Sequence, residues 1–259
     1  MQRWFPWLGA ATAGVVLWRV VAVAFPHTAS SDPQAVRWAA GLMGLWFIVW
    51  GLWTFHRART APSLVFAGYG LTAGLHWGGP IGIGSAGFQN VLLAFYIVVS
   101  SGLNSSLFLH LAIVVPPSNG TIRRRVTLLG LYLPPLIGVM LTMLLAVAPS
   151  DAGLLQPLLI LFPVVVLFTL IGGGLWIRRL IVADSISRWS HRLPLVVAAL
   201  ILGWLPHAFA STGLGPGPEA AGWFNLPFAV IPVAIAFSLA CPRAAAGKEP
   251  ASAKSAGET

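Results

Sequence analysis

Eight long apolar stretches, separated by short segments rich in Pro, Gly, Ser or Arg, dominate this sequence. A helix that crosses a bilayer needs about 20 mostly apolar residues. Strands of a membrane β-barrel would alternate apolar and polar residues over about 10 positions, and runs such as LLILFPVVVLFTLIGGGLWI do not. We therefore expect an all-α, polytopic helical membrane bundle. The expected spans are 5–25, 36–55, 62–79, 88–115, 126–148, 154–177, 193–212 and 223–241.

Composition excludes several classes of protein for this chain of 259 residues. Hydrophobic residues make up 57% of it and charged residues only 8%. An ordinary globular domain has about 25% charged residues, so these few charges cannot cover the surface of a water-soluble enzyme of this length. The apolar content also excludes a disordered protein. A single cysteine excludes an internal disulfide framework.

The basic residues predict the orientation in the membrane. They gather after the second, fourth and sixth stretches and at both ends of the chain, whereas the alternate segments contain almost none. By the positive-inside rule the basic side faces the cytoplasm, so both termini are expected there. An even number of spans requires the same arrangement. Of the 15 Lys and Arg residues, only Arg19 and Arg37 fall outside this pattern.

One transmembrane domain and one tail are expected. Residues 1–242 form the bundle, and residues 243–259, rich in Ala, Gly, Ser and Lys, form a disordered cytoplasmic tail. The first run, with the letters AVA at 22–24, could instead be a cleaved signal peptide, but Arg19 interrupts it and it is long for one. We therefore expect it to remain as the first span. The high isoelectric point does not require nucleic-acid binding, because no basic domain is present to carry it.

Polar and aromatic residues are expected to meet near the outer face. Arg19 lies in the outer half of the first span, and an intramembrane charge is costly enough to indicate function. Its long side chain could instead extend to the outer interface. Its counter-ion could be Asp32, Asp151 or Glu219. We predict an outward-facing ligand pocket lined by some of Arg19, Arg37, His76, Trp77 and His207.

Neither a cofactor nor catalysis is expected. The histidines could respond to pH, but no two have the local spacing of metal ligands, and scattered membrane histidines are more often packing residues. We predict no metal. The spans contain no Asp or Glu, and the chain lacks HExxH and GxSxG patterns. A non-enzymatic protein without catalytic residues is therefore expected.

The fourth stretch has a polar centre that reads SSGLNSS at 100–106. Ser100 and Asn104 would share one helix face, as would Ser101 and Ser105. This patch could line a ligand cavity or allow a bend that transmits a signal. Hydrogen bonding between helices, combined with tilt of an overlong span, is the alternative.

Two features could bind a protein partner. Glycines at a four-residue spacing make one flat helix face in the third stretch, against which another helix can pack closely. Helix packing is the expected role of this face, and docking of a partner helix is the alternative. Arginines of the inner loop after the sixth stretch could dock a cytoplasmic partner. The predicted partner-binding residues are Gly70, Gly74, Gly78, Arg178, Arg179, Arg188 and Arg192. The lipid bilayer is the other expected partner.

Several short motifs resemble a known class of sensor. The chain reads LFLHLAIVVPP, RRR and LLGLYLPPLIGVML around the end of the fourth stretch and the start of the fifth, then IRRLIVADSISRWSHRLPLVVAALILGWLPHAF and, in the last stretch, LPFAVIPVAIAFSLACPR. Over roughly residues 40 to 243 these segments resemble the N-terminal sensory regions of ComP-type bacterial sensor histidine kinases. The matching residues are His110, Pro116, Tyr132, Pro134, Arg178, Arg179, Asp184, Arg188, Arg192, Gly203 and Pro206.

This resemblance implies a multi-pass sensor-like protein of the bacterial cytoplasmic (inner) membrane that takes part in signal transduction. Such sensors continue into a kinase, cyclase or phosphatase domain, whereas only a short tail follows Pro242 here. We therefore expect a non-enzymatic sensor-like or accessory protein that passes its signal to a membrane or cytoplasmic partner. A structural subunit of a larger membrane complex is the alternative, and a facilitative transporter or channel is a third possibility.

Overall fold

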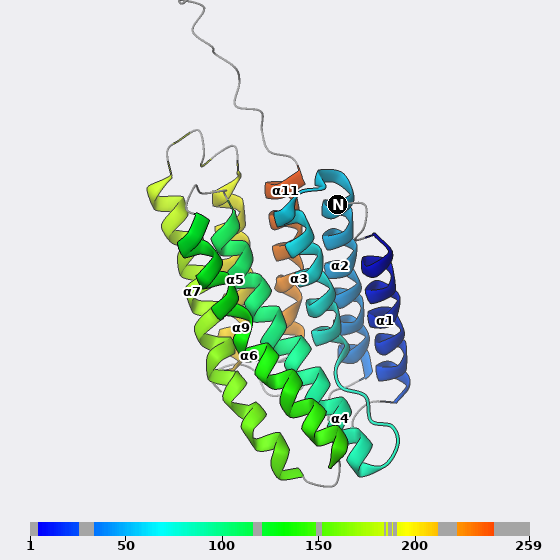
Figure 1. Ribbon diagram of the computed structural model, residues 1–259. Coiled ribbons are helices and arrows are strands. Elements are labelled where there is room, and N and C mark those ends of the chain that lie inside the picture. The colour runs from blue at the N-terminus through cyan, green and yellow to red at the C-terminus, as the bar shows by residue number, and fades with distance from the viewer. Residues whose placement is uncertain are drawn as a thin grey trace, which may run out of the picture.

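A computed structural model of the chain describes residues 5–25, 34–115, 121–148, 152–183, 185, 188, 191–211 and 222–240. Nearly all of these residues are helical, and none of them lies in a β-strand. The expected all-α bundle is therefore confirmed (Figure 1). The helices are α1 (Phe5–Ala24), α2 (Gln34–Ala58), α3 (Ala61–Gly78), α4 (Ala86–Ile97), η2 (Val98–Leu103), α5 (Asn104–Val114), α6 (Thr121–Val147), η3 (Ala152–Ile160), α7 (Leu161–Val182), α9 (Leu193–Ser211), η4 (Gly222–Ala229) and α11 (Val230–Ala240).

These elements form eight rods, because α4, η2 and α5 are continuous, as are η3 with α7 and η4 with α11. The rods coincide with the eight predicted stretches. In the part of the chain that the structure describes, five helices are long and apolar enough to cross a membrane: Pro6–Ala24, Ala35–Ala58, Ala86–Val114, Leu129–Val147 and Leu155–Val182. Two shorter apolar helices cover Leu193–Pro206 and Leu226–Ala240. The number of eight spans and the cytoplasmic position of the termini stay predictions.

Large apolar side chains cover the outer surface of the bundle. Leu129 is 76% exposed, Met140 60% and Ile181 70%, and many residues of α6, α7 and α9 are similarly exposed. A surface with this much apolar area is unfavourable in water and suits a hydrocarbon environment, in which helices satisfy their own backbone groups. The surface is therefore compatible with a membrane protein.

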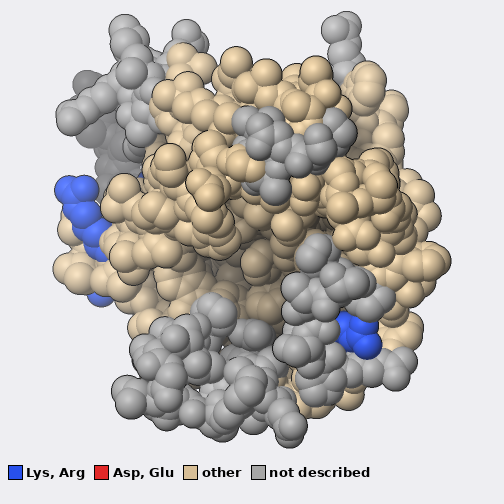
Figure 2. Space-filling view, turned by 90° about the horizontal axis from the view of Figure 1, so that it is seen from below, with Lys and Arg blue, Asp and Glu red and all other residues tan. Residues whose placement is uncertain are grey.

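The helices alternate in direction, so that the connections fall at two ends of the bundle. The α2–α3 turn, the end of α7 and the end of α11 lie at the upper end in Figure 1, together with the start of α1. This is the arrangement expected from the basic loops. Seen from below, the lower end of the bundle shows no acidic residue on its described surface and only a few Lys or Arg residues near the edge (Figure 2). All acidic residues of the sequence, and the predicted tail at 243–259, lie outside the described residues.

Helices α2 and α3 form a tight hairpin. Arg59 adopts a left-handed backbone conformation with φ of 50°, and Thr60 then caps α3 through its side chain, which accepts from the backbone N–H of Ser63. Further along, a Cβ on Gly70 would lie 2.6 Å from the carbonyl oxygen of Phe47 in α2. The missing side chain at Gly70 therefore allows the backbones of α2 and α3 to approach closely.

The glycine stripe consequently serves packing within the chain. Gly70 and Gly74 are both buried, and a Cβ on Gly74 would lie 2.6 Å from the side chain of Ile48. The predicted docking role of these two glycines is thus corrected, because α2 already occupies their face. Gly78 is the last residue of α3.

In the polar centre of the fourth stretch, residues 104–106 begin α5, whereas residues 100–103 lie in a π-helix, η2. Such i→i+5 turns are rare, short and frequent at functional sites. In the first turn of α5, Ser106 is fully buried. Its hydroxyl donates to the carbonyl oxygens of Gly102 (3.0 Å) and of Leu131 in α6 (2.9 Å). The predicted hydrogen bonding between helices is therefore present, and η2 also contacts α3, α6 and α7.

Candidate functional site

A partly open cavity of about 590 Å³ lies among the helices of the bundle. Pockets that bind small molecules usually measure about 300–1,000 Å³, so this cavity has the size of a ligand site. Its walls come from α2, α3, η2, α5, α7, α9 and η4. No Lys, Arg, Asp or Glu is among the described residues that line it. We call this space the central cavity; its polar lining residues are His76, Ser100, Ser101, Asn104, Ser105 and Thr169.

Most of the polar lining comes from η2 and the first turn of α5, as the sequence allowed. The Ser100 side chain is only 1% exposed, and its hydroxyl interacts with the hydroxyl of Tyr96 without a well-formed hydrogen bond. A buried hydroxyl that lacks a well-formed hydrogen bond is costly and uncommon in native proteins. An occupant that offers a hydrogen-bonding group to Ser100 would remove this cost.

Asn104 is held against α3 by Thr72. The Thr72 hydroxyl lies 2.9 Å from Oδ1 of Asn104 and 3.0 Å from the carbonyl oxygen of Tyr69. This contact uses one of the two amide atoms of Asn104. The other stays available to an occupant of the central cavity, which Asn104 lines.

Aromatic rings make up much of the remaining wall. Trp77 packs against Phe228 of η4, with ring centroids 5.6 Å apart, and Phe108 lies 5.5 Å from Trp204 of α9. Flat rigid rings of this kind bind apolar ligand surface at low entropic cost. The aromatic lining residues are Phe47, Tyr69, Trp77, Phe108, Trp204 and Phe228.

Two of the five predicted ligand-binding residues, His76 and Trp77, line the central cavity. They are neighbours at the end of α3, with ring centroids 5.2 Å apart. The His76 carbonyl oxygen accepts a hydrogen bond from the hydroxyl of Tyr96 in α4 at 2.9 Å. This contact fixes the end of α3 against the fourth rod.

Arg19 lies elsewhere, between α1, α2 and α3. Its side chain is only 4% exposed, so it does not extend to the interface, which corrects that alternative. Nη1 donates to the Gly74 carbonyl oxygen at 2.7 Å, and Nη2 donates to that of Gly41. We call the space formed by Gly41, Gly44 and Gly74 the glycine socket. The guanidinium there joins three helices and does not line the central cavity.

Of the other two predicted pocket residues, one lies away from the central cavity, and the side chain of the other lies outside the described residues. Arg37 is half-buried near the start of α2 and is not among the cavity residues. His207 belongs to α9, but its side chain lies outside the described residues. The possible counter-ions Asp32, Asp151 and Glu219 lie outside them as well.

The predicted inner-loop arginines surround the ends of α5, α7 and α11. Arg179 donates to the carbonyl oxygen of Ile113 at 2.8 Å, and Arg188 to that of Ala183 at 2.9 Å. Both acceptors lie at helix C-termini, where positive charge is favourable. Arg192 adopts φ of 50° and places its guanidinium over the ring of Phe237.

These contacts tie the loop to the bundle, whereas Arg178 is exposed at the surface. Burial, and then the positive charge of Arg179, lower the pKa of the neighbouring His191. The Ser238 hydroxyl of α11 donates to the backbone carbonyl of His191 at 2.6 Å. Arg178 is thus the predicted docking residue most accessible to a partner.

Two residues of the sensor-like motifs are in contact. His110 Nδ1 lies 2.6 Å from the hydroxyl of Tyr132, so a hydrogen bond joins α5 to α6 near their basic ends. The His110 ring also meets the Tyr132 ring edge to face. Asp184, another matching residue, lies outside the described residues.

Sequence reasoning missed part of the central cavity. Thr169 lines the cavity and Thr72 holds its lining residue Asn104. Both are polar residues in apolar stretches, a signal that could have marked them for attention. Phe108, Trp204 and Phe228 carry no such signal, because apolar spans contain many aromatic residues. Within the described part of the chain, no group of three or more His, Cys, Asp or Glu could hold a metal ion.

Comparisons with known proteins give no further information on the site. The chain matches no family model, no curated protein and no solved structure.

Proposed function

We propose that this protein is a non-enzymatic, sensor-like membrane protein that binds a small uncharged ligand in the central cavity. The observation that carries the proposal is a ligand-sized space lined by hydroxyl groups, an amide and aromatic rings, with no charged side chain among its described walls. The buried Ser100 hydroxyl, which makes no well-formed hydrogen bond in the described structure, supports a ligand with its own hydrogen-bonding group.

The lining of the central cavity disfavours the binding of a charged ligand. A charged ligand would lose its hydration at a cost of several kcal/mol, and the described lining offers no opposite charge to compensate. A hydroxyl or carbonyl group can instead exchange its bonds with water for bonds to Ser100 and Asn104. The ligand class is therefore a neutral molecule with an apolar body and a small polar head.

The π-helix η2 is also placed to pass the effect of a bound ligand on to neighbouring helices. Segment η2 supplies Ser100 and Ser101 to the central cavity and contacts α3, α6 and α7. A π-helix can shift its hydrogen-bond register more readily than a regular helix, so an occupant at η2 would move these neighbours. Helix α7 leads to the arginine-rich loop, where Arg178 is exposed for a partner. The resemblance to ComP-type sensors in the bacterial cytoplasmic membrane favours this direction of signalling.

A photoreactive pair of probes tests the proposal. A diazirine derivative of octanol and the corresponding octanoate would be added to the protein in lipid nanodiscs and illuminated. Labelled residues would be identified by mass spectrometry. We expect the alcohol to label cavity residues such as Tyr69 and Phe108, with unlabelled octanol competing, and the carboxylate to leave them unlabelled.

Asn104→Leu keeps the approximate volume of the side chain and removes its amide. We expect labelling of the central cavity to fall about tenfold, the effect of losing one hydrogen bond of about 1.4 kcal/mol. Asn90→Leu makes the same replacement on α4, away from the cavity, and should label as wild type does. Labelling confined to lipid-exposed residues, or equal labelling by the carboxylate, would refute the proposal.

A further inference from the structure

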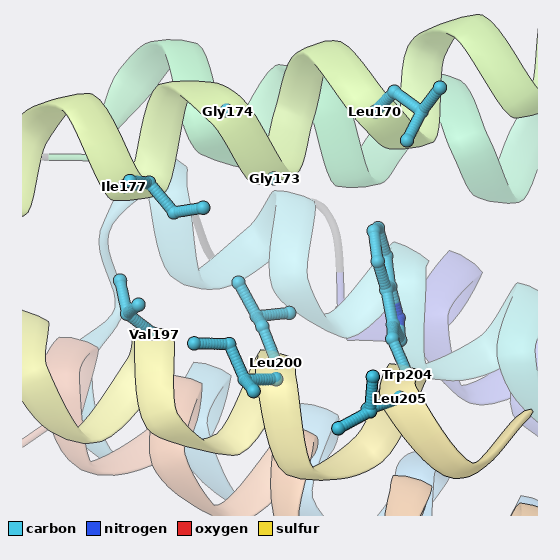
Figure 3. Close-up of a pocket in the computed structure, with 9 residues that line it drawn as sticks. Leu170, Gly173, Gly174, Ile177, Val197, Leu200, Trp204 and Leu205 are labelled. Atoms are coloured by element: carbon cyan, nitrogen blue, oxygen red, sulfur yellow. The ribbon is translucent and has the colours of Figure 1, made fainter. Parts of the chain in front are cut away.

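A second hollow lies on the outside of the bundle, between α7 and α9 (Figure 3). We call it the α7–α9 groove; it has a volume of about 420 Å³ and is lined by residues of 170–177 in α7 and 197–205 in α9. All of the lining residues are glycine or have apolar side chains, apart from the indole N–H of Trp204. Leu170 is 63% exposed, Ile201 51% and Leu205 66%. The groove therefore faces the surroundings of the helices, which in a membrane is the lipid phase.

The groove and the central cavity share a wall. Leu170 and Trp204 line both spaces. Figure 3 shows the Trp204 side chain extending from α9 towards α7, beside Gly173. A Cβ on Gly173 would lie 3.4 Å from Cζ3 of the Trp204 indole. On the cavity side, the centroids of the Phe108 and Trp204 rings are 5.5 Å apart. The side chains of Leu170 and Trp204 therefore separate the α7–α9 groove from the central cavity.

We infer that the ligand enters the central cavity sideways from the bilayer through the α7–α9 groove, and that Trp204 and Leu170 form the gate. This inference rests on the proposed function and specifies its ligand as a neutral, single-chain amphiphile dissolved in the membrane. The chain would lie in the apolar groove while its hydroxyl or carbonyl head passes the indole to reach Ser100 and Asn104. A molecule with a long apolar body partitions into lipid, so its concentration is highest where the groove lies.

Two glycines of α7 line this route. At Gly173 a Cβ would be in ordinary van der Waals contact with the Trp204 ring. At Gly174 a Cβ would meet nothing within 4 Å, because it would project into open space. Gly174→Leu therefore fills the α7–α9 groove without a clash in the core and without changing any residue of the central cavity.

The experiment measures the rate at which the cavity is loaded. Protein in nanodiscs would be mixed rapidly with vesicles containing the diazirine derivative of dodecanol, and flashes at increasing delays would record labelling of Tyr69 and Phe108. For Gly174→Leu we expect loading to slow about tenfold or more, an added barrier of about 1.4 kcal/mol, with the same final extent of labelling. Ile201→Trp narrows the groove from α9 and should also slow loading.

Gly130→Leu is the matched control. Gly130 is an exposed glycine of α6 whose added Cβ would also meet nothing within 4 Å, and it lies outside both spaces. It should load at the wild-type rate. Wild-type loading in both groove variants would overturn lateral entry while leaving the proposed function intact. Absence of cavity labelling in the wild type, even after long exposure, would instead reject the proposed function and the entry route with it.

Discussion

Alanine at Gly44 tests whether the buried Arg19 is held by the glycine socket. A Cβ at Gly44 would overlap Nη1 of Arg19 and would lie 2.9 Å from its Cζ and 2.8 Å from the carbonyl oxygen of Gly74. The guanidinium can only move away by giving up its hydrogen bond to Gly74, which is 2.7 Å long. The backbones of α2 and α3 must also separate slightly.

The expected magnitude follows from these contacts. Overpacking a buried site costs about 1–3 kcal/mol, and losing a hydrogen bond from a charged group costs about 1.5–3 kcal/mol. Replacing a helical glycine with alanine returns about 0.5–1 kcal/mol. We expect Gly44→Ala to lower the free energy of unfolding by about 2–5 kcal/mol. Gly14→Ala on α1, where an added Cβ meets nothing within 4 Å, should raise it by about 0.5–1 kcal/mol.

Equilibrium unfolding in mixed micelles, followed by far-UV circular dichroism, would measure both variants. The double variant Gly44→Ala with Arg19→Met removes the overlapping guanidinium, so its loss of stability should be smaller than the sum of the single losses by at least about 1 kcal/mol. A Gly44→Ala protein within about 0.5 kcal/mol of wild type, or additive behaviour of the two substitutions, would refute the reasoning.

Two further predictions concern stability. Ser106→Ala removes the buried hydroxyl that joins α5 to α6, so the free energy of unfolding should fall by about 0.5–1.5 kcal/mol in the same assay; an unchanged value would show that the bond to Leu131 contributes nothing. The pKa of His191 is lowered in the folded state, so the unfolded chain takes up this proton first and stability should fall as pH drops below about 6.5. His191→Gln should flatten this dependence, and an equally steep fall in that variant would assign the effect to another group.

The sequence was sufficient to locate the rods and the polar wall. A run of 20 apolar residues has few alternatives to a helix, and SSGLNSS stands out within such a run. It could not show that residues 100–103 lie in a π-helix, because that hydrogen-bond register depends on how α3, α6 and α7 pack around them. The aromatic lining was equally inaccessible, since Trp204 and Phe228 resemble any other belt residue until the rods are assembled.

Arg19 shows the same limit for a single charge. Its position in the first span allowed both an internal role and extension to the interface. The choice depends on Gly41 and Gly44 in the second span and Gly74 in the third, which together leave room for a guanidinium between helices. A set of glycines in neighbouring spans beside an intramembrane arginine is the signal that could have favoured burial.

Helix α3 contributes both to the central cavity and to the glycine socket that holds Arg19. Its Ala73 and His76 line the central cavity, while Gly74, on the side towards α2, accepts the hydrogen bond from Arg19. Helix α1 packs against α2 and α3 and is held by this arginine and by Trp18, whose indole donates to the Gly79 carbonyl at 3.0 Å and whose ring lies 5.5 Å from the Phe95 ring of α4. Any occupant that displaces α3 therefore also displaces the acceptors that hold α1. The position of α1 should report occupancy of a cavity that α1 does not line, while the socket keeps the Arg19 charge away from a site suited to neutral ligands.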